Sequence, residues 1–415
     1  TNKERERGKG REAMFLPFTF PSTTRHLMRI SGPDALPFLQ GVLSCGVAAT
    51  QTQRRGPQRP SVPAANTTAA VVHPMGVFTP RGRLLCEGFL VQGGTEGLLL
   101  DVHQQVAPLL HTYLCRMRLR KQVRLEDVSQ QFSVSVFPSL PSKSLLGEEE
   151  GDGFLAMGAD LRHPWLGFRC YHPTGAARAA VLCSQGEEQY HVMRICLGIP
   201  EGPMELPPNG PIPIECNLDL HHAIDFHKGC YVGQELMART KHRGVVRKRV
   251  LPVVFHDPEV QSASSLLQTA LHSQETGSAA NWWYPKRGGD TGSEDAPSHT
   301  TLAAPASSTS SSIQLFTTTP SGEAPPTRHR RPVADLLCVR NGQWGLALVR
   351  LSQAFPSLHN PQLDTVVFDG HQGPAYSVPL QVGLSLGAEE VNPILPSAKC
   401  ATVILPEHFR LEVDD

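Results

Sequence analysis

The feature that most limits the possible folds is a series of short apolar runs, separated by glycine-rich turns and interrupted by single helix-like segments. Apolar residues recur every three or four positions after Asp34 and again over 103–117, which predicts two helices. The runs between them are short and rich in β-branched or aromatic residues, which is typical of strands. This mixture predicts an α+β fold rather than a doubly wound parallel sheet. The expected strands occupy 26–30, 71–72, 83–91, 97–102, 123–128 and 132–137.

Changes in composition suggest three parts of the chain. Residues 1–20 begin with alternating basic and acidic residues, and we expect a disordered tail there. Residues 21–245 form the α+β region, with a boundary between two subdomains near the acidic loop at 140–150. Residues 246–415 read as a C-terminal β domain. Its segment 257–332 is rich in Ser, Thr, Ala, Gly and Pro, so we expect a disordered insertion.

Charge and hydropathy exclude several classes of partner. Lys plus Arg and Asp plus Glu both total 38, so the formal net charge is zero and nucleic acid is not the expected partner. No apolar stretch approaches the roughly 20 residues that span a bilayer, which predicts a soluble protein without a membrane partner. The 10 cysteines include no C-x-x-C pair, and we interpret them as free thiols in a reducing compartment.

One cysteine lies in a segment with unusual local chemistry. Gly229 and Gly233 bracket Cys230, and helix-forming residues follow from Gln234 onward. A cysteine just before a helix, two residues from Lys228, is favoured as a thiolate. Such a thiolate can act as a nucleophile, a redox group or a metal ligand. The alternative is a small buried apolar residue.

Three further groups of residues carry candidate chemistry. Glu215 follows a proline-rich loop and could accept hydrogen bonds from a heterocycle, or it could be an exposed carboxylate at the end of a strand. A histidine-rich stretch has metal-binding residue types but no compact zinc spacing: His221, His222, Asp225 and His227. A basic run could hold an anionic tail or an acidic partner, or be a solvated face: Arg239, Lys241, His242, Arg243, Arg247, Lys248 and Arg249.

The octapeptide 228–235 resembles the signature of the YgfZ family. It continues at 238–240 and 244–249, and shorter similar stretches lie at 30–35, 198–202, 213–219 and 345–350. Within the family the sequence is most similar to the mitochondrial members, which act in iron–sulfur cluster assembly. The resemblance covers about 25–255 and resumes after the insertion.

The resemblance implies a fold, a partner and a location. The fold would be that of the aminomethyltransferase (T-protein) of glycine cleavage, a multi-domain ring around a central channel with a C-terminal β-barrel. The implied function is maturation of 4Fe–4S proteins in the mitochondrial matrix, with an A-type iron–sulfur scaffold protein as partner. Cys230 would be a ligand of a cluster shared with that partner, since one cysteine cannot supply about four ligands. Supporting motif positions are Gly229, Gly233, Gln234 and Glu235.

The same resemblance implies a second possibility, a tetrahydrofolate-dependent aminomethyl or one-carbon transferase. By motif position, Glu215 would hold the pteridine, with Lys228, Tyr231 and Arg239 as further folate-binding candidates. The catalytic Asp of T-protein falls on Cys86, or on Glu87 after a one-residue slip. Because a thiol does not replace that carboxylate as acid or base, the glycine-cleavage reaction is not predicted for this chain.

Overall fold

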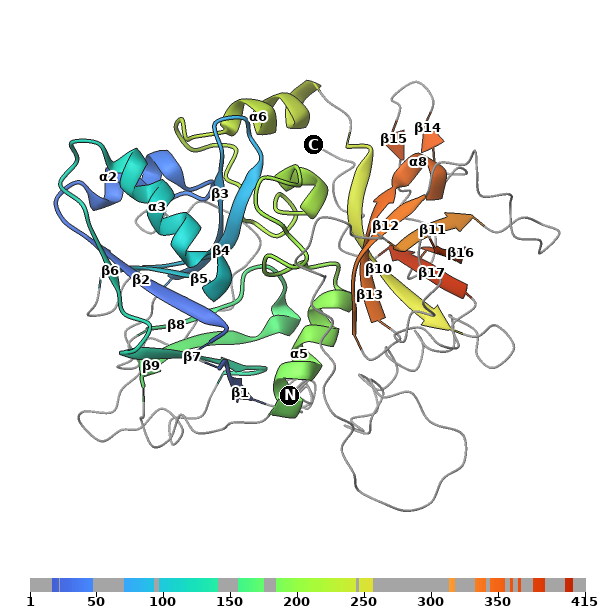
Figure 1. The fold of residues 1–415 in the computed structure, drawn as a ribbon, viewed down its shortest axis with the longest axis horizontal. Coiled ribbons are helices and arrows are strands. Elements are labelled where there is room, and N and C mark those ends of the chain that lie inside the picture. Colours follow the sequence, from blue (N-terminus) through green and yellow to red (C-terminus); the bar gives the residue numbers. More distant parts are fainter. Residues whose placement is uncertain are drawn as a thin grey trace, which may run out of the picture.

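The computed structural model describes residues 17–21, 23–47, 71–92, 97–140, 156–174, 184–243, 246–256, 313–317, 333–340, 344–354, 359–360, 365–366, 376–384 and 400–405. These ranges contain helices, a five-stranded sheet, a four-stranded sheet, a two-stranded sheet and a closed barrel (Figure 1). The predicted α+β class is therefore confirmed.

The five-stranded sheet has the order β3-β4-β5-β2-β6, and all of its neighbouring strands are antiparallel. Two helices, α2 (Ala35–Val42) and α3 (Ala107–Arg118), cover one face, and their apolar sides are buried against it. A 3₁₀ turn, η3 (Gln104–Val106), precedes α3. The strands agree with the predicted runs: β2 (Arg25–Ser31), β3 (Val71–Phe78), β4 (Leu84–Gln92), β5 (Leu98–His103) and β6 (Arg124–Asp127).

The four-stranded sheet has the order β1-β7-β9-β8 and corrects two predictions. Its strand β1 (Phe18–Thr19) lies inside the predicted tail, because Phe18 and Phe20 are buried in the core; residues 1–16 are outside the described part. The chain passes from one sheet to the other between β6 and β7, before the predicted boundary at 140–150. That boundary was therefore wrong, because the last strand before it pairs with strands beyond it. The remaining strands are β7 (Phe132–Phe137), β8 (Ala156–Ala159) and β9 (Phe168–Pro173), with η4 (Pro164–Leu166) between the last two.

The two sheets pack together through a second apolar core. Leu27, Phe89 and Leu99 come from the five-stranded sheet, and Val134 and Tyr171 come from the four-stranded sheet. Helix α5 (Ser184–Cys196) completes this core with buried apolar side chains. Fully buried polar side chains, including Asp101 and Arg169, lie at this junction of the sheets with α5.

The C-terminal strands close into a barrel, in the order β10-β13-β12-β11-β16-β17. Its strand β11 (Ile313–Thr317) lies within the predicted disordered insertion, so that prediction was wrong for this segment; the flanking residues 257–312 and 318–332 lie outside the described part. The ring around a central channel stays a prediction. The other barrel strands are β10 (Lys248–His256), β12 (Ala334–Arg340), β13 (Trp344–Arg350), β16 (Tyr376–Leu384) and β17 (Cys400–Leu405). Nearby are α8 (Leu351–Ala354), β14 (His359–Asn360) and β15 (Thr365–Val366).

The segment from Leu197 to α6 (Gln234–Arg243) connects the sheets with the barrel and includes η5 (Pro213–Cys216). A third apolar core joins all three parts: it includes Phe78 of β3, Tyr231 of the connecting segment and Trp344 of the barrel. Among the described residues, no helix is both long enough and apolar enough to cross a membrane.

Candidate functional site

The motif loop, residues 228–233, is anchored to the end of α2. The N–H of Val232 donates to the carbonyl oxygen of Gly41 at 3.0 Å, and just upstream the N–H of Asp225 donates to the carbonyl of Ser44 at 2.9 Å. The Ser44 hydroxyl donates in turn to the carbonyl of Ala223 at 2.6 Å. These bonds hold the loop in one position relative to the five-stranded sheet.

Lys228 forms the strongest of these anchors. Its ammonium donates to the carbonyl oxygens of Leu43 and Cys45 at 2.7 and 2.8 Å, and lies 5.0 Å from the centre of the Tyr231 ring. Burial lowers the pKa of Lys228 to about 8. The described contacts of Lys228 are therefore with the protein itself, and its position suits a structural clamp for the loop.

Cys230 is exposed, in contrast to seven other cysteines that are buried or partly buried: Cys45, Cys86, Cys115, Cys170, Cys196, Cys216 and Cys338. The Gln234 amide donates to its sulfur at 3.6 Å, and the side-chain oxygen of Gln234 accepts the N–H of Tyr231 at 3.0 Å. Gln234 thus fixes the loop around the thiol. The thiol lies just before α6, as the sequence predicts. No group of three or more His, Cys, Asp or Glu side chains in the described ranges could hold a metal ion.

The motif glycines Gly229 and Gly233 have different roles, and Gly82 of the β3–β4 turn acts together with Gly233. Gly233 has φ +83°, and a Cβ there would lie 2.6 Å from the carbonyl oxygen of Thr79. Gly82 has φ +75°, and a Cβ there would meet Leu236 of α6 at 2.6 Å. These two glycines let α6 and the β3–β4 turn approach closely. A Cβ on Gly229 would meet nothing within 4 Å, so this glycine leaves open space beside Cys230.

The predicted folate-binding residues lie in three places, the motif loop, α6 and η5. Lys228 and Tyr231 lie together in the motif loop, whereas Arg239 is exposed on α6. Glu215 is half-buried on η5, and its charged neighbours Lys248, Arg83 and Arg350 come from other elements. Burial raises the pKa of Glu215 despite these cations. Glu235 is exposed at the start of α6.

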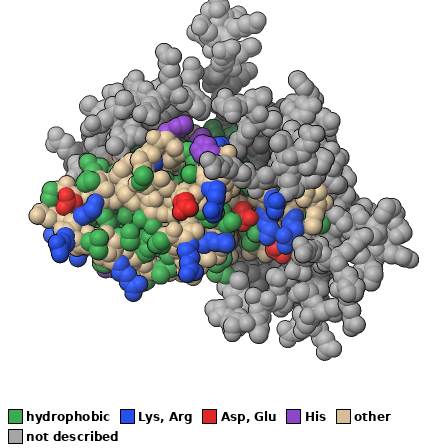
Figure 2. Space-filling model, turned by 90° about the horizontal axis from the view of Figure 1, so that it is seen from above, with side chains coloured by type: hydrophobic (Ala, Val, Ile, Leu, Met, Phe, Trp, Pro, Cys, Tyr) green, Lys and Arg blue, Asp and Glu red, His purple; other side chains and the backbone are tan. Residues whose placement is uncertain are grey.

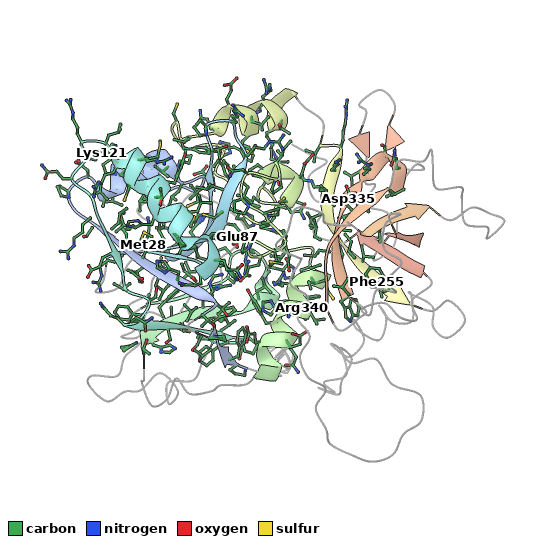
Figure 3. All side chains as sticks on the ribbon, in the orientation of Figure 1. Met28, Glu87, Lys121, Phe255, Asp335 and Arg340 are labelled. Atoms are coloured by element: carbon green, nitrogen blue, oxygen red, sulfur yellow. The ribbon has the colours of Figure 1, made fainter. Side chains whose placement is uncertain are left out.

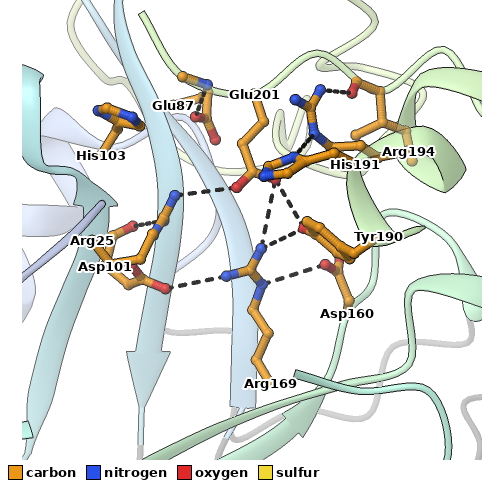
Figure 4. A network of polar contacts seen from close by, with 12 residues as sticks. Arg25, Glu87, Asp101, His103, Asp160, Arg169, Tyr190, His191, Arg194 and Glu201 are labelled. Atoms are coloured by element: carbon orange, nitrogen blue, oxygen red, sulfur yellow. Dashed lines mark hydrogen bonds and ion pairs between the residues drawn. The ribbon is translucent and has the colours of Figure 1, made fainter. Parts of the chain in front are cut away.

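A set of buried polar side chains joins the two sheets and α5 (Figure 4). The guanidinium of Arg169 donates to the Tyr190 hydroxyl at 2.7 Å and contacts the carboxylates of Asp160 and Asp101 at 3.4 and 3.5 Å. Glu201 accepts from Arg162 at 2.9 Å, from Tyr190 at 2.9 Å and from Arg25 at 3.3 Å. We call this set the buried ion network: Arg25, Asp101, Asp160, Arg162, Arg169, Tyr190 and Glu201.

The network controls the charge of its carboxylates. Burial acts to raise the pKa of Glu201, but the guanidinium groups of Arg162 and Arg169 outweigh it and hold this pKa well below its ordinary value. Beside the network, Glu87 accepts the N–H of Gly202 at 3.0 Å. Burial and the Glu201 charge raise the pKa of Glu87.

Glu87 lines a shallow hollow together with Cys86, His103 and Leu206, and this hollow has no room for a water molecule. Small-molecule sites usually enclose roughly 300–1,000 Å³. The hollow is therefore closed to a pteridine in this structure, and the surrounding side chains would have to move apart to admit one. Cys86 is buried and its thiol pKa is raised by burial. Of the two candidates for the catalytic Asp of T-protein, Glu87 supplies the carboxyl group beside the network.

Sequence reasoning found the motif loop but missed what holds it. Ser44 and the backbone carbonyls near Cys45 anchor the loop from about 180 residues away, and only a spatial contact could reveal them. Glu201 was noted as part of a family-like stretch without a role. The three arginines of the network carried no local pattern that points to Glu201, since they lie 32 to 176 positions away from it in the sequence.

Curated relatives match a little over half of the sequence. The chain is 34% identical over 242 residues to "Iron-sulfur cluster assembly factor IBA57, mitochondrial" of Mus musculus, covering 56% of this chain and 65% of that protein. The match to the Homo sapiens protein of the same name has the same identity and coverage. A fungal relative, "Iron-sulfur cluster assembly factor IBA57 homolog, mitochondrial" of Mycosarcoma maydis, is 32% identical over 241 residues, covering 56% of each chain. The matched region thus spans less than two thirds of each of these relatives.

The fold resembles a solved transferase. The glycine cleavage system aminomethyltransferase T from Bartonella henselae superposes with a TM-score of 0.54 and 10% sequence identity, covering 96% of this chain and 88% of that one. This likeness supports the predicted relation to the T-protein fold. No family model matches the chain.

Proposed function

We propose that this chain holds an iron–sulfur cluster through Cys230 for transfer to other proteins, because it is similar to mitochondrial iron–sulfur cluster assembly factors over 56% of its length. The cluster is cargo that the chain shares with a second protein. The proposed site is mitochondrial, in the matrix, and the proposed partner is an A-type iron–sulfur scaffold protein. The proposed outcome is the maturation of 4Fe–4S proteins.

The observation that supports this proposal best is the exposure of Cys230 on an anchored loop. Iron–sulfur clusters are commonly held by about four cysteine thiolates. Cys230 faces solvent, and the described residues place no metal-binding group of three or more side chains anywhere in the structure. A thiol presented in this way is suited to a site that another protein completes.

The neighbouring residues have positioning roles in this proposal. Lys228 ties the loop to the end of α2, and Gln234 donates to the sulfur while fixing the backbone of Tyr231. The open space beside Gly229 leaves room for the inorganic atoms of a cluster. On binding iron, the Cys230 thiol loses its proton and its sulfur takes one coordination position, while the partner supplies the others.

The experiment mixes the purified chain with a reconstituted A-type scaffold protein that carries a 2Fe–2S cluster. We expect a coloured complex that elutes as one species in size exclusion and shows the visible absorption of the cluster. Cys230→Ala should abolish this species, and Cys230→Ser is a second variant because a serine oxygen can replace sulfur weakly. Cys115→Ser, at a partly buried cysteine on α3, is the matched control. An unchanged coloured complex with Cys230→Ala would remove Cys230 as a ligand.

A second candidate function is tetrahydrofolate binding with one-carbon transfer, which the likeness to an aminomethyltransferase fold favours. Calorimetry with tetrahydrofolate tests it. If Glu215 holds the pteridine, as the motif position implies, Glu215→Ala should weaken tetrahydrofolate binding. If folate binds beside Glu87 instead, Glu87→Gln should weaken it. Transfer itself would require turnover of an aminomethyl donor, and binding without turnover would leave folate as a ligand only.

A further inference from the structure

A protruding turn carries the most exposed large apolar side chain of the described residues. Leu119, directly after α3, is 84% exposed and has φ +50°. A bulky residue with positive φ is strained, and such strain persists where the surrounding structure imposes it. Exposure and strain together mean that Leu119 contributes nothing evident to the stability of the fold.

The turn is nevertheless fixed. The N–H of Lys121 donates to the carbonyl of Arg118 at 3.0 Å, and the N–H of Gln122 donates to the Asp34 carboxylate at 2.7 Å. A Cβ on Gly32 would lie 2.3 Å from the Gln122 carbonyl oxygen, so only glycine allows this approach. The base of the turn is therefore rigid, and it presents Leu119 to solvent in one orientation.

Basic side chains surround this leucine. Arg116, Arg120, Lys121 and Arg124 are exposed, and within the described ranges none of them forms an ion pair. The neighbouring Glu126 contacts Arg29 at 3.4 Å instead. Figure 3 places Lys121 at the end of the molecule away from the barrel, and Figure 2 shows Lys and Arg side chains among apolar ones at that end of the coloured surface. Since the whole chain has zero net charge, this concentration of cations is local.

Helix α2 connects the turn to the motif loop. Asp34, just before α2, bonds to Gln122 of the turn, and Gly41 near the end of α2 bonds to Val232 of the motif loop. The helix has 8 residues and is therefore about 12 Å long. Its solvent side carries Leu36, which is 54% exposed, and the exposed Pro37. A partner surface of about 800 Å² is large enough to cover both the turn at one end of α2 and the motif loop at its other end.

We propose that this surface is where the protein that completes the Cys230 site docks, with an acidic face against the turn. We call it the docking stripe: Cys230, Pro37, Leu36, Leu119, Arg120 and Lys121. The inference rests on the proposed cluster-holding function and adds the chemistry of the partner. Leu36 and Leu119 lose water on docking, which supplies affinity, and the cations attract an acidic surface and set its orientation.

The test measures the dissociation constant for the full-length chain with the A-type scaffold protein carrying its 2Fe–2S cluster. Replacing Arg120 and Lys121 with Gln should raise the dissociation constant about tenfold at low salt, with a smaller effect at high salt. Gln130→Glu with Gln131→Glu is the control, because it changes the net charge by the same two units on an exposed turn at the other end of β6. This control should bind as the unmodified protein does.

Leu119→Gly separates docking from folding. Glycine adopts positive φ without strain, so the melting temperature should stay the same or rise, while binding weakens about tenfold from the lost apolar contact. Normal binding by both turn variants, together with loss of the complex in Cys230→Ala, would overturn the docking stripe and leave the proposed function intact. An equal loss in the Gln130/Gln131 control would also overturn it. A cluster complex that survives Cys230→Ala would instead contradict the proposed function.

Discussion

Lys228 holds the motif loop in place by donating hydrogen bonds to backbone carbonyl oxygens of another segment. Its ammonium bonds to the carbonyl oxygens of Leu43 and Cys45, so it links two segments that lie far apart in the sequence. The sequence indicated that Lys228 matters, since it precedes Cys230 in a family-like motif. These contacts do not support the proposed role of Lys228 in folate binding. They are the contacts expected of a residue that fixes the loop carrying the Cys230 thiol.

The first prediction concerns this clamp. Lys228→Met keeps most of the apolar stem but removes the donors, leaving two carbonyl oxygens without their partner. We expect a loss of about 1–3 kcal/mol in the free energy of unfolding, measured by urea denaturation. Lys241→Met, at an exposed residue of α6, is the comparison and should cost less. Equal losses in both variants would contradict the clamp.

At the scale of elements, the motif loop and α6 are held against the β3–β4 turn by close backbone approach. Gly233 and Gly82 both have positive φ, and each lies where a Cβ would overlap a neighbour. The position of α6 relative to Cys230 therefore depends on these two glycines.

The second prediction separates the glycines of the motif. Gly233→Ala should destabilise the protein by about 2–3 kcal/mol, because it adds both strain at positive φ and a contact with the Thr79 carbonyl oxygen. Gly229→Ala meets open space and should change stability by less than about 0.5 kcal/mol. Thermal unfolding of the two variants side by side measures the difference. A Gly233→Ala variant with the melting temperature of the wild type would contradict the close approach of residue 233 to the Thr79 carbonyl oxygen.

The positions of individual helices and strands were the part of the fold that the sequence predicted best. Strands such as β4 and the helices α3 and α6 follow directly from apolar spacing and helix-forming residues. Strand β1 was missed because it has only 2 residues and lies between Pro17 and Pro21. Strand β11 was missed because it lies in a Ser- and Thr-rich segment, and only pairing with distant strands identifies either of them. The docking of the motif loop on α2 could not be foreseen for the same reason, because it depends on contacts between residues far apart in the sequence.

At the scale of the whole molecule, the buried ion network joins two sheets and a helix through charges that have left water. Such charges are costly unless each is paired, and removing one partner leaves the others uncompensated. Glu201 contacts Arg25 of the five-stranded sheet and Arg169 of the four-stranded sheet, so it links the two sheets. No sequence pattern predicts this arrangement, because its members are separated by as many as 176 positions.

The third prediction concerns acid. The folded-state pKa of Glu201 lies below its ordinary value of 4.5, so its stabilising contribution is full above pH 4.5 and is lost as the pH falls through the folded-state pKa. Glu201→Gln should therefore lower the melting temperature strongly at pH 7 and by less at pH 3. Glu87→Gln is the matched control with the opposite sign: the pKa of Glu87 is raised, so its charge disfavours folding at pH 7 and the variant should be as stable as the wild type or more so. A uniform loss at all pH values in both variants would contradict this assignment.

The measurement that tests the central claim most directly is native mass spectrometry of the chain with the A-type scaffold protein and its cluster. For the wild type the account predicts a heteromeric species whose mass includes both chains and the iron and sulfide atoms. For Cys230→Ala it predicts that this species is absent while both folded chains remain. A cluster-containing complex of the same mass and abundance with Cys230→Ala would contradict the claim that Cys230 is a cluster ligand.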